Sequence, residues 1–452
     1  MREIITIQVG QAGIQVGNAV WEQYCAEHNI STAGKQQRVT KDNSFKVFFE
    51  ETSSGQFVDL EPDVIDNMKS GPLGSLFDKD FLLSGKEDSA NIFSRGCFLG
   101  KQILDKMDDQ LRKLADNCDN LMGFMVTHSI GGGTGSGVGA LIFEGFNLYY
   151  KKKVRVGCSI FPSYSISSSV VEPYNALFAV GSLLDFTDIV LVFDNESMYN
   201  ICQRNLHIAK PDVSNVNRLI AKVMSSMTVS LRFGGELNAS LDELQMNLIP
   251  FPRLHFLTTG MSPIVSKMDV NTISNDVQTI TDECFKPTNW LVHYNSFDPM
   301  DDKYMSIVLN YRGNITSKEA NTSIQWLKKN DKVRLVEWCP TGFKIGLNDI
   351  PATILEQDDI GAFSKNAVMI ANNIGISRMF NERITRKFDL MYNQRAFVHW
   401  YLGYGRRERQ FGITRQDLGY LERDYLDVLS EQITDEAVDD YVNDDNNDTN
   451  YY

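Results

Sequence analysis

A run of glycines interrupted by two hydroxyl residues is the segment of this chain best suited to bind an anion. Residues 131–137 read Gly-Gly-Gly-Thr-Gly-Ser-Gly, between a largely apolar run over 121–129 and a second over 138–144. This order predicts a strand, a tight turn and a helix. Glycines let the backbone approach a ligand closely, and the free N–H groups at a helix start carry partial positive charge. We therefore expect a di- or triphosphate here. The alternative, a flexible turn, rarely lies between two buried elements.

A second glycine turn, Gly10-Gln11-Ala12-Gly13, follows a strand-like run over 2–9. Neither turn matches the two commonest phosphate motifs. The loop at 131–137 lacks the Gly-Lys-Ser/Thr ending that brings a lysine to the outer phosphates. The glycines at 10, 13 and 17 have the wrong spacing for a dinucleotide fingerprint. In a parallel α/β sheet both turns would lie at the carboxyl edge of the strands, where ligands bind.

Composition excludes several classes of protein. A formal net charge of −14 argues against nucleic-acid binding, which favours a basic face. The sequence has no run of 18 apolar residues, so we expect no membrane span, and its opening lacks a signal-peptide pattern. The seven cysteines are dispersed and form no CxxC pair, which indicates reduced thiols in the cytoplasm and no zinc site.

The chain divides into four predicted parts. Residues 1–195 alternate strand-like runs (4–9, 122–126, 154–161, 189–193) with helix-like runs, which predicts an α/β domain with a parallel, Rossmann-like sheet. Residues 196–372 begin with a long buried helix over 213–232 and continue as a mixed α+β intermediate domain, with strands near 254–257, 304–311 and 343–347. Residues 373–429 are mainly helical. The acidic tail, 430–452, contains no lysine or arginine, and we expect it to be disordered.

Several motifs, in order along the chain, resemble the tubulin family. They are the loop at 131–137, the opening Met1-Arg2-Glu3-Ile4 with its turn at 10–13, and the segments 170–175, 337–344 and 395–401. The resemblance covers residues 1 to about 428. Within the family the chain looks like an α-tubulin, because of the segments 21–28 and 421–425, a long loop over 350–365 and the final Tyr452.

The resemblance implies GTP and Mg²⁺ as ligands and assigns residues to them. Glu61 would hold Mg²⁺, which prefers oxygen ligands. The phosphates, ribose and guanine would be held by Gly10, Gln11, Ala12, Gln15, Asp88, Asn91, Ser129, Gly132, Gly133, Thr134, Gly135, Ser168, Glu172, Asn195 and Asn217. The last two would read guanine through their amide donors and acceptors.

The resemblance also implies that catalysis is shared between subunits. Glu243 matches the glutamate with which an α-tubulin completes GTP hydrolysis on the β-tubulin of the next dimer, and such head-to-tail contacts build open filaments. The chain's own GTP would stay at the interface with its β-tubulin partner. Asp242 is interpreted as an ordinary solvated acid. The expected location is the cytoplasm, in microtubules.

Some positions depart from the family pattern. Ser240 replaces an aspartate, Val213 a tyrosine that stacks on guanine, and Thr272 a histidine in the lateral loop. Arg406, Arg407 and Arg409 lie where the family is acidic, which would weaken contacts with basic motors and microtubule-associated proteins. These changes keep open a second hypothesis, a structural or capping tubulin that binds GTP without supporting hydrolysis. A nicotinamide oxidoreductase is disfavoured, because no dinucleotide fingerprint is present.

Overall fold

The computed structural model describes residues 3–37, 44–49, 55–163, 169–235, 237, 240–272, 274–294 and 302–429. The acidic tail predicted at 430–452 and the predicted ribose contact Ser168 lie outside these ranges. Within the described ranges, no helix is both long and apolar enough to cross a membrane.

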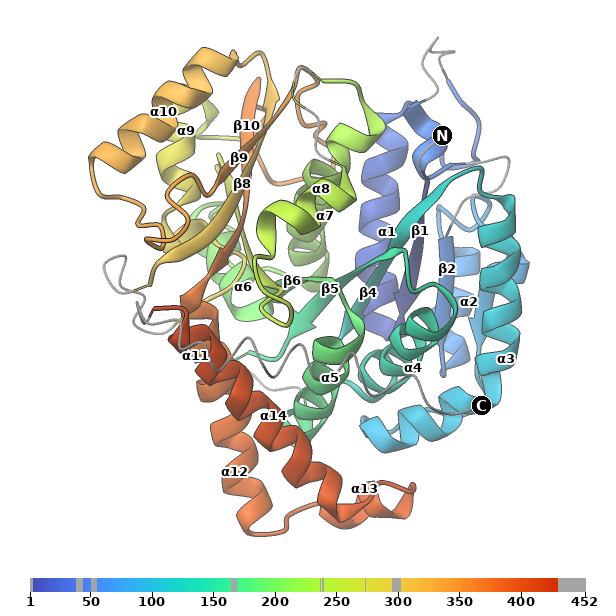
Figure 1. Ribbon diagram of the computed structural model, residues 1–452. Helices are drawn as coiled ribbons and strands as arrows, with labels where there is room; N and C mark the ends of the chain where they lie inside the picture. The colour runs from blue at the N-terminus through green and yellow to red at the C-terminus, as the bar shows by residue number, and fades with distance from the viewer. Residues whose placement is uncertain are drawn as a thin grey trace.

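In these described ranges, ten strands form one sheet in the order β3-β2-β1-β4-β5-β6-β7-β10-β8-β9 (Figure 1). All neighbours are parallel from β3 to β7; β10 runs antiparallel to β7 and β8, and β8 pairs with β9 in parallel. The strands are β1 Glu3–Val9, β2 Gly55–Asp59, β3 Leu82–Ser84, β4 Leu121–Ser129, β5 Val154–Phe161, β6 Ile189–Asp194, β7 Phe256–Ser262, β8 Tyr304–Gly313, β9 Phe343–Asn348 and β10 Lys365–Asn373. The predicted α/β fold with a parallel sheet is confirmed.

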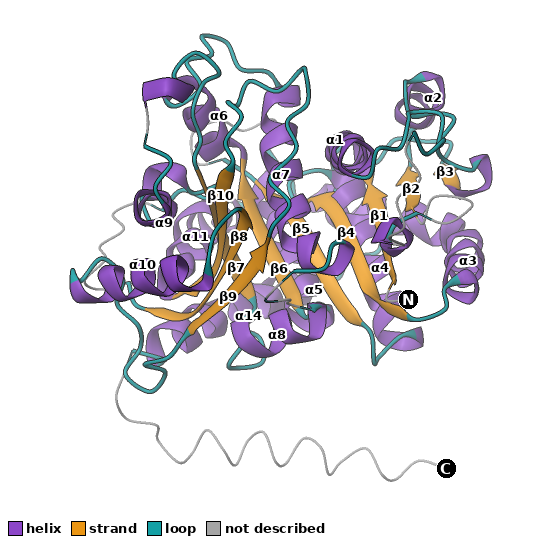
Figure 2. Ribbon diagram, turned by 90° about the horizontal axis from the view of Figure 1, so that it is seen from above, coloured by secondary structure: helices purple, strands orange, loops and turns teal. Residues whose placement is uncertain are grey.

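Helices cover both faces of the sheet (Figure 2). They are α1 Gly10–Glu27, α2 Pro62–Ser70, α3 Phe93–Asn117, α4 Gly133–Tyr149, α5 Glu172–Phe186, α6 Asn195–Arg204, α7 Val213–Arg232, α8 Leu241–Leu248, α9 Val277–Cys284, α10 Ser317–Lys329, α11 Ser377–Met379, α12 Arg386–Asn393, α13 Val398–Gly403 and α14 Glu408–Asp427. A π-helical stretch, Phe380–Thr385, joins α11 to α12. The four domain boundaries stay a prediction, and the sheet itself continues across the first of them through the pairing of β6 with β7.

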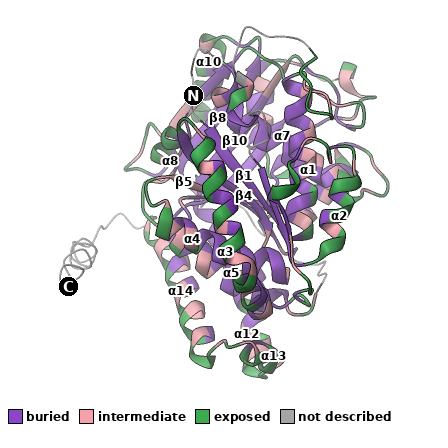
Figure 3. Cartoon of the chain, turned by 90° about the vertical axis from the view of Figure 1, so that its right-hand side faces the viewer, coloured by how far each residue is buried: buried purple, intermediate pink, exposed green. Residues whose placement is uncertain are grey.

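Alternation along the strands produces two hydrophobic layers. Ile5 and Ile7 of β1 face the core under α3, α4 and α5, whereas Ile4 faces the core under α1 and α7. Because the strands are buried on both faces, they consist mainly of apolar residues, as parallel strands do. Figure 3 shows the buried sheet and the exposed outer face of α3.

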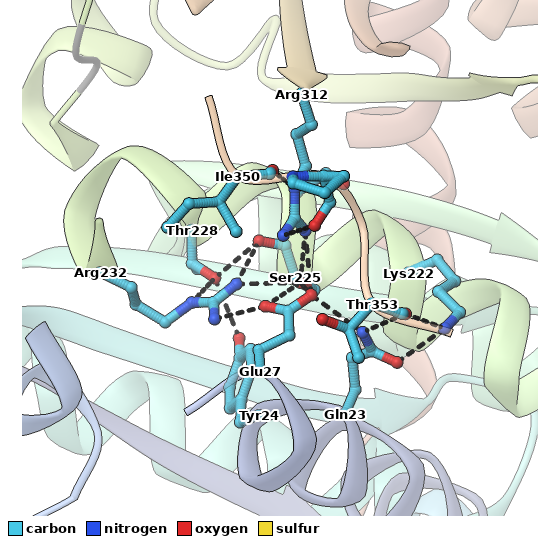
Figure 4. Close-up of polar contacts among 12 residues, drawn as sticks. Gln23, Tyr24, Glu27, Lys222, Ser225, Thr228, Arg232, Arg312, Ile350 and Thr353 are labelled. Atoms are coloured by element: carbon cyan, nitrogen blue, oxygen red, sulfur yellow. Dashed lines mark hydrogen bonds and ion pairs between the residues drawn. The ribbon is translucent and has the colours of Figure 1, made fainter. Parts of the chain in front are cut away.

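A buried charge cluster joins the two halves of the sheet (Figure 4). Glu27, at the end of α1, lies 2.5 Å from the Arg232 guanidinium on α7 and 3.0 Å from that of Arg312 on β8, and all three side chains are almost fully buried. The Ser225 hydroxyl donates to the same carboxylate. Burial by itself raises the pKa of Glu27, but the two guanidinium groups outweigh it and hold this pKa well below its usual range.

The same cluster fixes the long loop between β9 and β10. Arg312 donates to the carbonyl oxygens of Ile350 and Pro351, both at 3.2 Å. The Lys222 ammonium lies 2.5 Å from Asp358 and donates to the Thr353 carbonyl at 2.7 Å. The loop that the sequence singled out as α-like therefore packs on α1 and α7 through buried polar contacts.

Replacing Glu27 with glutamine should lower the free energy of unfolding by about 3–5 kcal/mol, because two buried guanidinium groups would lose their counter-charge. Chemical denaturation measures this change. The matched control is Asp66→Asn, which breaks an exposed pair with Lys69 at 2.9 Å and should cost less than about 1 kcal/mol. Equal losses in the two variants would contradict the role given to the cluster.

Candidate functional site

Two helices begin side by side at the carboxyl edge of the sheet. Strands β1 and β4 are parallel neighbours, with Val9 opposite His128 at their ends. Helix α1 starts at Gly10, directly after β1, and α4 starts at Gly133, within the glycine segment 131–137, so most of the predicted turn is helical. Neither start is capped by a side chain. Since the first N–H groups of a helix have no partner inside it, this edge presents two adjacent sets of donors suited to phosphate oxygens.

Close packing explains why glycine occupies the two helix starts. Gly10 has φ +72°, and a Cβ added there would lie 3.1 Å from the amide nitrogen of Gly135. A Cβ on Gly135 would lie 2.5 Å from the carbonyl oxygen of Ser129, a distance that real Cβ atoms do not tolerate. Gly10 thus lies so close to the Gly135 backbone that no side chain fits there, and Gly135 in turn lies close to the end of β4.

Side chains behind the turn hold it in place. His128 Nδ1 lies 3.0 Å from the Gly135 carbonyl oxygen, and its Nε2 lies 2.9 Å from the Ser159 hydroxyl. A carbonyl only accepts, so Nδ1 carries the proton and Nε2 accepts from the hydroxyl. Burial lowers the pKa of His128 to about 4, which keeps the ring neutral near pH 7. The Thr134 and Ser89 hydroxyls are 3.1 Å apart, so Thr134 is tied to the segment before α3.

Three carboxylates gather beside the turn. Glu61 precedes α2, and Asp59 ends β2, where its Oδ1 accepts the Glu61 amide at 3.3 Å. Burial raises the pKa of Asp59 to about 6; backbone amides lower it, and the nearby charges of Glu61 and Asp88 raise it again. The sequence reasoning missed Asp59, because only its burial distinguishes it from any acid at a strand end.

These carboxylates suit a metal ion that is shared with a phosphate. In the described part of the chain, no three His, Cys, Asp or Glu side chains are grouped to hold a metal by themselves. Mg²⁺ commonly takes only one or two carboxylates, together with water and phosphate oxygens. Glu61 and Asp88 are exposed, so their oxygens are available to such an ion.

The remaining predicted phosphate contacts lie around the same turn. Gln11 and Gln15 are exposed one helical turn apart on α1, so they share a face beyond Gly10. Asn91 has φ +55°, and its Oδ1 is the atom nearest to a Cβ added at Gly132, at 3.9 Å. Ala12 is half-buried in the first turn of α1.

The predicted ribose and base contacts flank the turn. Buried Glu172 starts α5, and its Cγ lies 3.4 Å from the position of a Cβ on Gly131. Asn195 starts α6 at the end of β6, two strands from β4, a separation of about 10 Å. Asn217 is buried near the start of α7, whereas Val213 is half-exposed. Among the described residues, no hydrogen bond or ion pair joins either asparagine to the glycine turn, so their role stays a prediction.

The structure also reveals Asn175, to which the sequence reasoning gave no role. Its side-chain amide donates hydrogen bonds to the carbonyl oxygens of Gly131 and Asn91, and it accepts one from the backbone amide of Phe93. The only sequence signal was its position in the segment 170–175, which carried the family resemblance. Its contacts come from three separate parts of the chain, so spacing does not predict them.

Glu243 lies away from this group. It is exposed on α8, beyond the far end of α7, and α7 has 20 residues and so spans about 30 Å from the end that carries Asn217. The Glu243 amide donates to the Ser240 hydroxyl at 3.2 Å, which caps α8. The Lys344 ammonium lies 3.5 Å from the Glu243 carboxylate.

The three arginines expected on one surface differ in their surroundings. The Arg406 guanidinium lies over the rings of Phe178 at 4.2 Å and Phe93 at 4.9 Å, and burial lowers its pKa. Arg407 and Arg409 are exposed. The basic surface predicted from the three residues therefore consists of Arg407 and Arg409. The Thr272 side chain lies outside the described residues.

Comparisons with known proteins agree along nearly the whole chain. Residues 3–203 match the GTPase domain of the Tubulin/FtsZ family, and residues 252–385 match the Tubulin C-terminal domain. The Tubulin alpha-1 chain of Arabidopsis thaliana is 44% identical, covering 98% of this chain and 100% of the relative. The nucleomorph Tubulin alpha chain of Guillardia theta is 44% identical (95% and 98%), and the Tubulin alpha-2 chain of Schizosaccharomyces pombe is 46% identical (95% and 97%).

Gly135→Ala should push the start of α4 away from the end of β4, because its Cβ would meet the Ser129 carbonyl oxygen at 2.5 Å. We expect a loss of about 1–3 kcal/mol in unfolding free energy and a loss of bound nucleotide. Gly145→Ala, on the same helix, is the control, since the nearest atom to its Cβ would be 3.9 Å away. Nucleotide content and chemical denaturation of both variants measure the difference. Normal nucleotide content in Gly135→Ala would show that the close approach is dispensable.

Proposed function

The chain belongs to the tubulin family, as its motifs predicted, and from this premise we propose that it is the α subunit of a tubulin heterodimer. It would bind GTP at its interface with β-tubulin and assemble into microtubules of the cytoplasmic cytoskeleton. The observation that carries the proposal is the pair of uncapped helix starts, α1 and α4, which lie close together at the edge of the sheet. The likeness to α-tubulins over almost the full length supports the choice of subunit.

The residues present fit a guanine nucleotide. The phosphates would lie against the amides of Gly10, Gln11 and residues 132–135, where backbone donors without caps are concentrated. Glu172 at the start of α5 would bind the ribose, and the amides of Asn195 and Asn217 offer the mixed donors and acceptors that guanine needs. Val213 offers the base only apolar contact, so we expect base packing to be weaker by about 1 kcal/mol than with an aromatic ring.

The acidic side of the site fits Mg²⁺. Glu61 and Asp88 would hold the ion, with Asp59 behind them as a buried acid whose pKa is raised chiefly by burial and further by the charges of Glu61 and Asp88. When bound, Mg²⁺ supplies charge neutralisation for the phosphate oxygens. The chain's own residues position it: β2 places Asp59, and the start of α2 places Glu61.

We propose that Glu243 acts on the nucleotide of a second subunit. Its separation from Asn217 by the length of α7 keeps it from the nucleotide of its own chain. Head-to-tail stacking would bring α8 to the exposed nucleotide of the next β subunit. There the carboxylate would orient an attacking water and accept its proton. Ser240 provides the cap that holds the first turn of α8, so the replacement of aspartate preserves this support.

A second candidate is a structural or capping tubulin that binds GTP without supporting hydrolysis. The observation in its favour is that Ser240 is neutral, so no second carboxylate lies at this position beside Glu243. The exposed Arg407 and Arg409 would repel basic motor surfaces under both candidates, so they do not distinguish between them. Phosphate release during assembly separates the two candidates.

Glu243→Ala, co-assembled with β-tubulin, should form filaments in which phosphate release falls at least about a hundredfold, the usual contribution of a general base. Asp242→Ala is the matched control, because Asp242 is the exposed acid next to it in the same helix. It should leave the rate within about twofold of the unmodified chain, since exposed residues away from the chemistry have small effects. Filaments of the unmodified chain that release no phosphate would favour the second candidate; unchanged release in Glu243→Ala would remove Glu243 from the mechanism.

A further inference from the structure

Asn175 is a fully buried side chain whose hydrogen-bonding capacity is used completely. Its Oδ1 accepts the Phe93 amide at 2.9 Å and the Tyr401 hydroxyl at 2.7 Å. Its Nδ2 donates to the carbonyl oxygens of Asn91 at 2.7 Å and Gly131 at 2.9 Å. A side-chain amide has two donors and two acceptor positions, so none remains free. The partners also fix which end is oxygen, because an amide N–H needs an acceptor and a carbonyl needs a donor.

The groups held by Asn175 belong to the two segments that face the proposed phosphates. Gly131 opens the glycine turn, and Asn91 and Phe93 close the segment that contains Asp88. Within that segment Ala90 and Asn91 both have positive φ, at +48° and +55°, a conformation that costs energy in residues other than glycine. Such a segment keeps its shape only when its surroundings hold it, and Asn175 supplies two of the holding bonds.

The fourth partner comes from the C-terminal helices. Tyr401 lies on α13, is fully buried, and packs against the rings of Tyr174 and Phe411 at 5.3 Å and 5.9 Å. Its neighbours in the chain, Trp400 and Leu402, are 51% and 39% exposed, so α13 is a surface element whose buried residues are Val398 and Tyr401. The hydroxyl of Tyr401 therefore connects a surface helix to the amide that fixes both phosphate-facing segments.

We propose that Asn175 is a positioning residue for the nucleotide and that the Tyr401 hydroxyl locks it, so that the C-terminal helices control how firmly the nucleotide is held. This rests on the proposed binding of GTP. Without the hydroxyl, one lone pair of Oδ1 loses its donor and the amide gains freedom to turn. Both segments then loosen together, because the same amide holds them.

Tyr401→Phe tests the proposal with the loss of one oxygen atom and no change in ring packing. The full chain is prepared with its partner subunit, and nucleotide that exchanges rapidly is first replaced by unlabelled GDP. Release of the remaining guanine nucleotide is then followed by chromatography. We expect release to be about threefold to tenfold faster, the effect of one net hydrogen bond. Asn175→Asp, which loses both donors to carbonyl oxygens, should have a larger effect.

Tyr311→Phe is the matched control. Tyr311 is equally buried, and its hydroxyl lies 2.8 Å from Thr281, in the part of the sheet away from the glycine turn. Chemical denaturation should show similar losses of stability for the two phenylalanine variants, with faster release in Tyr401→Phe alone. Equal release rates in the two variants would overturn the proposal and leave Asn175 a purely structural residue. Unmodified chain without guanine nucleotide would instead overturn the proposed function.

Discussion

The close approach of Gly10 to the backbone of Gly135 is the constraint on which the rest of the structure depends. Two helix starts meet there only because β1 and β4 are parallel neighbours and because no side chain separates the turns. The parallel sheet directs both sets of amides to one edge. Everything that touches a nucleotide must then lie at that edge, and the helices that begin there must end at the opposite one.

Helix α1 connects the carboxyl edge of the sheet to the opposite edge. It begins at Gly10 and ends at Glu27, where the buried carboxylate binds Arg232 and Arg312 (Figure 4). Removing three charges from water is costly, and apolar residues of the same size often give equal stability. The cluster does fix the relative orientation of three elements. Because the carboxylate accepts hydrogen bonds from guanidinium groups on α7 and β8, it holds α1, α7 and the intermediate part of the sheet in one arrangement.

The sequence predicted the local features of the site and missed those that tertiary contacts create. The strand at 154–161 and the helix at 213–232 coincide with β5 and α7, because a local apolar pattern determines both and Asp212 caps the start of the helix. The strand predicted at 254–257 is observed as Phe256–Ser262, since its buried Thr258 and Thr259 broke the apolar pattern.

Burial and distant partners account for the residues whose surroundings differ from their sequence reading. Arg406 was read as a surface charge, but its stem brings the guanidinium over two aromatic rings. In the sequence Glu27 is indistinguishable from an exposed helix glutamate, but in the structure α7 and β8 bury it. Asn175 gains its role only when α5 brings it beside Gly131, 44 residues earlier in the chain. A single sequence gives the residue types but does not show which distant residues come into contact.

The polarity of the sheet also supports the proposal that catalysis is shared between subunits. A carboxylate on α8 lies beyond the far end of α7, so it faces away from the phosphates that α1 and α4 would hold. Folding of one chain does not bring α8 to the starts of α1 and α4, because the buried contacts of Glu27 fix the direction of α7. A second chain, stacked in the same orientation, places its far end against the near end of the first. Under the proposed arrangement hydrolysis would depend on assembly, and an unassembled subunit would have a nucleotide site without its carboxylate.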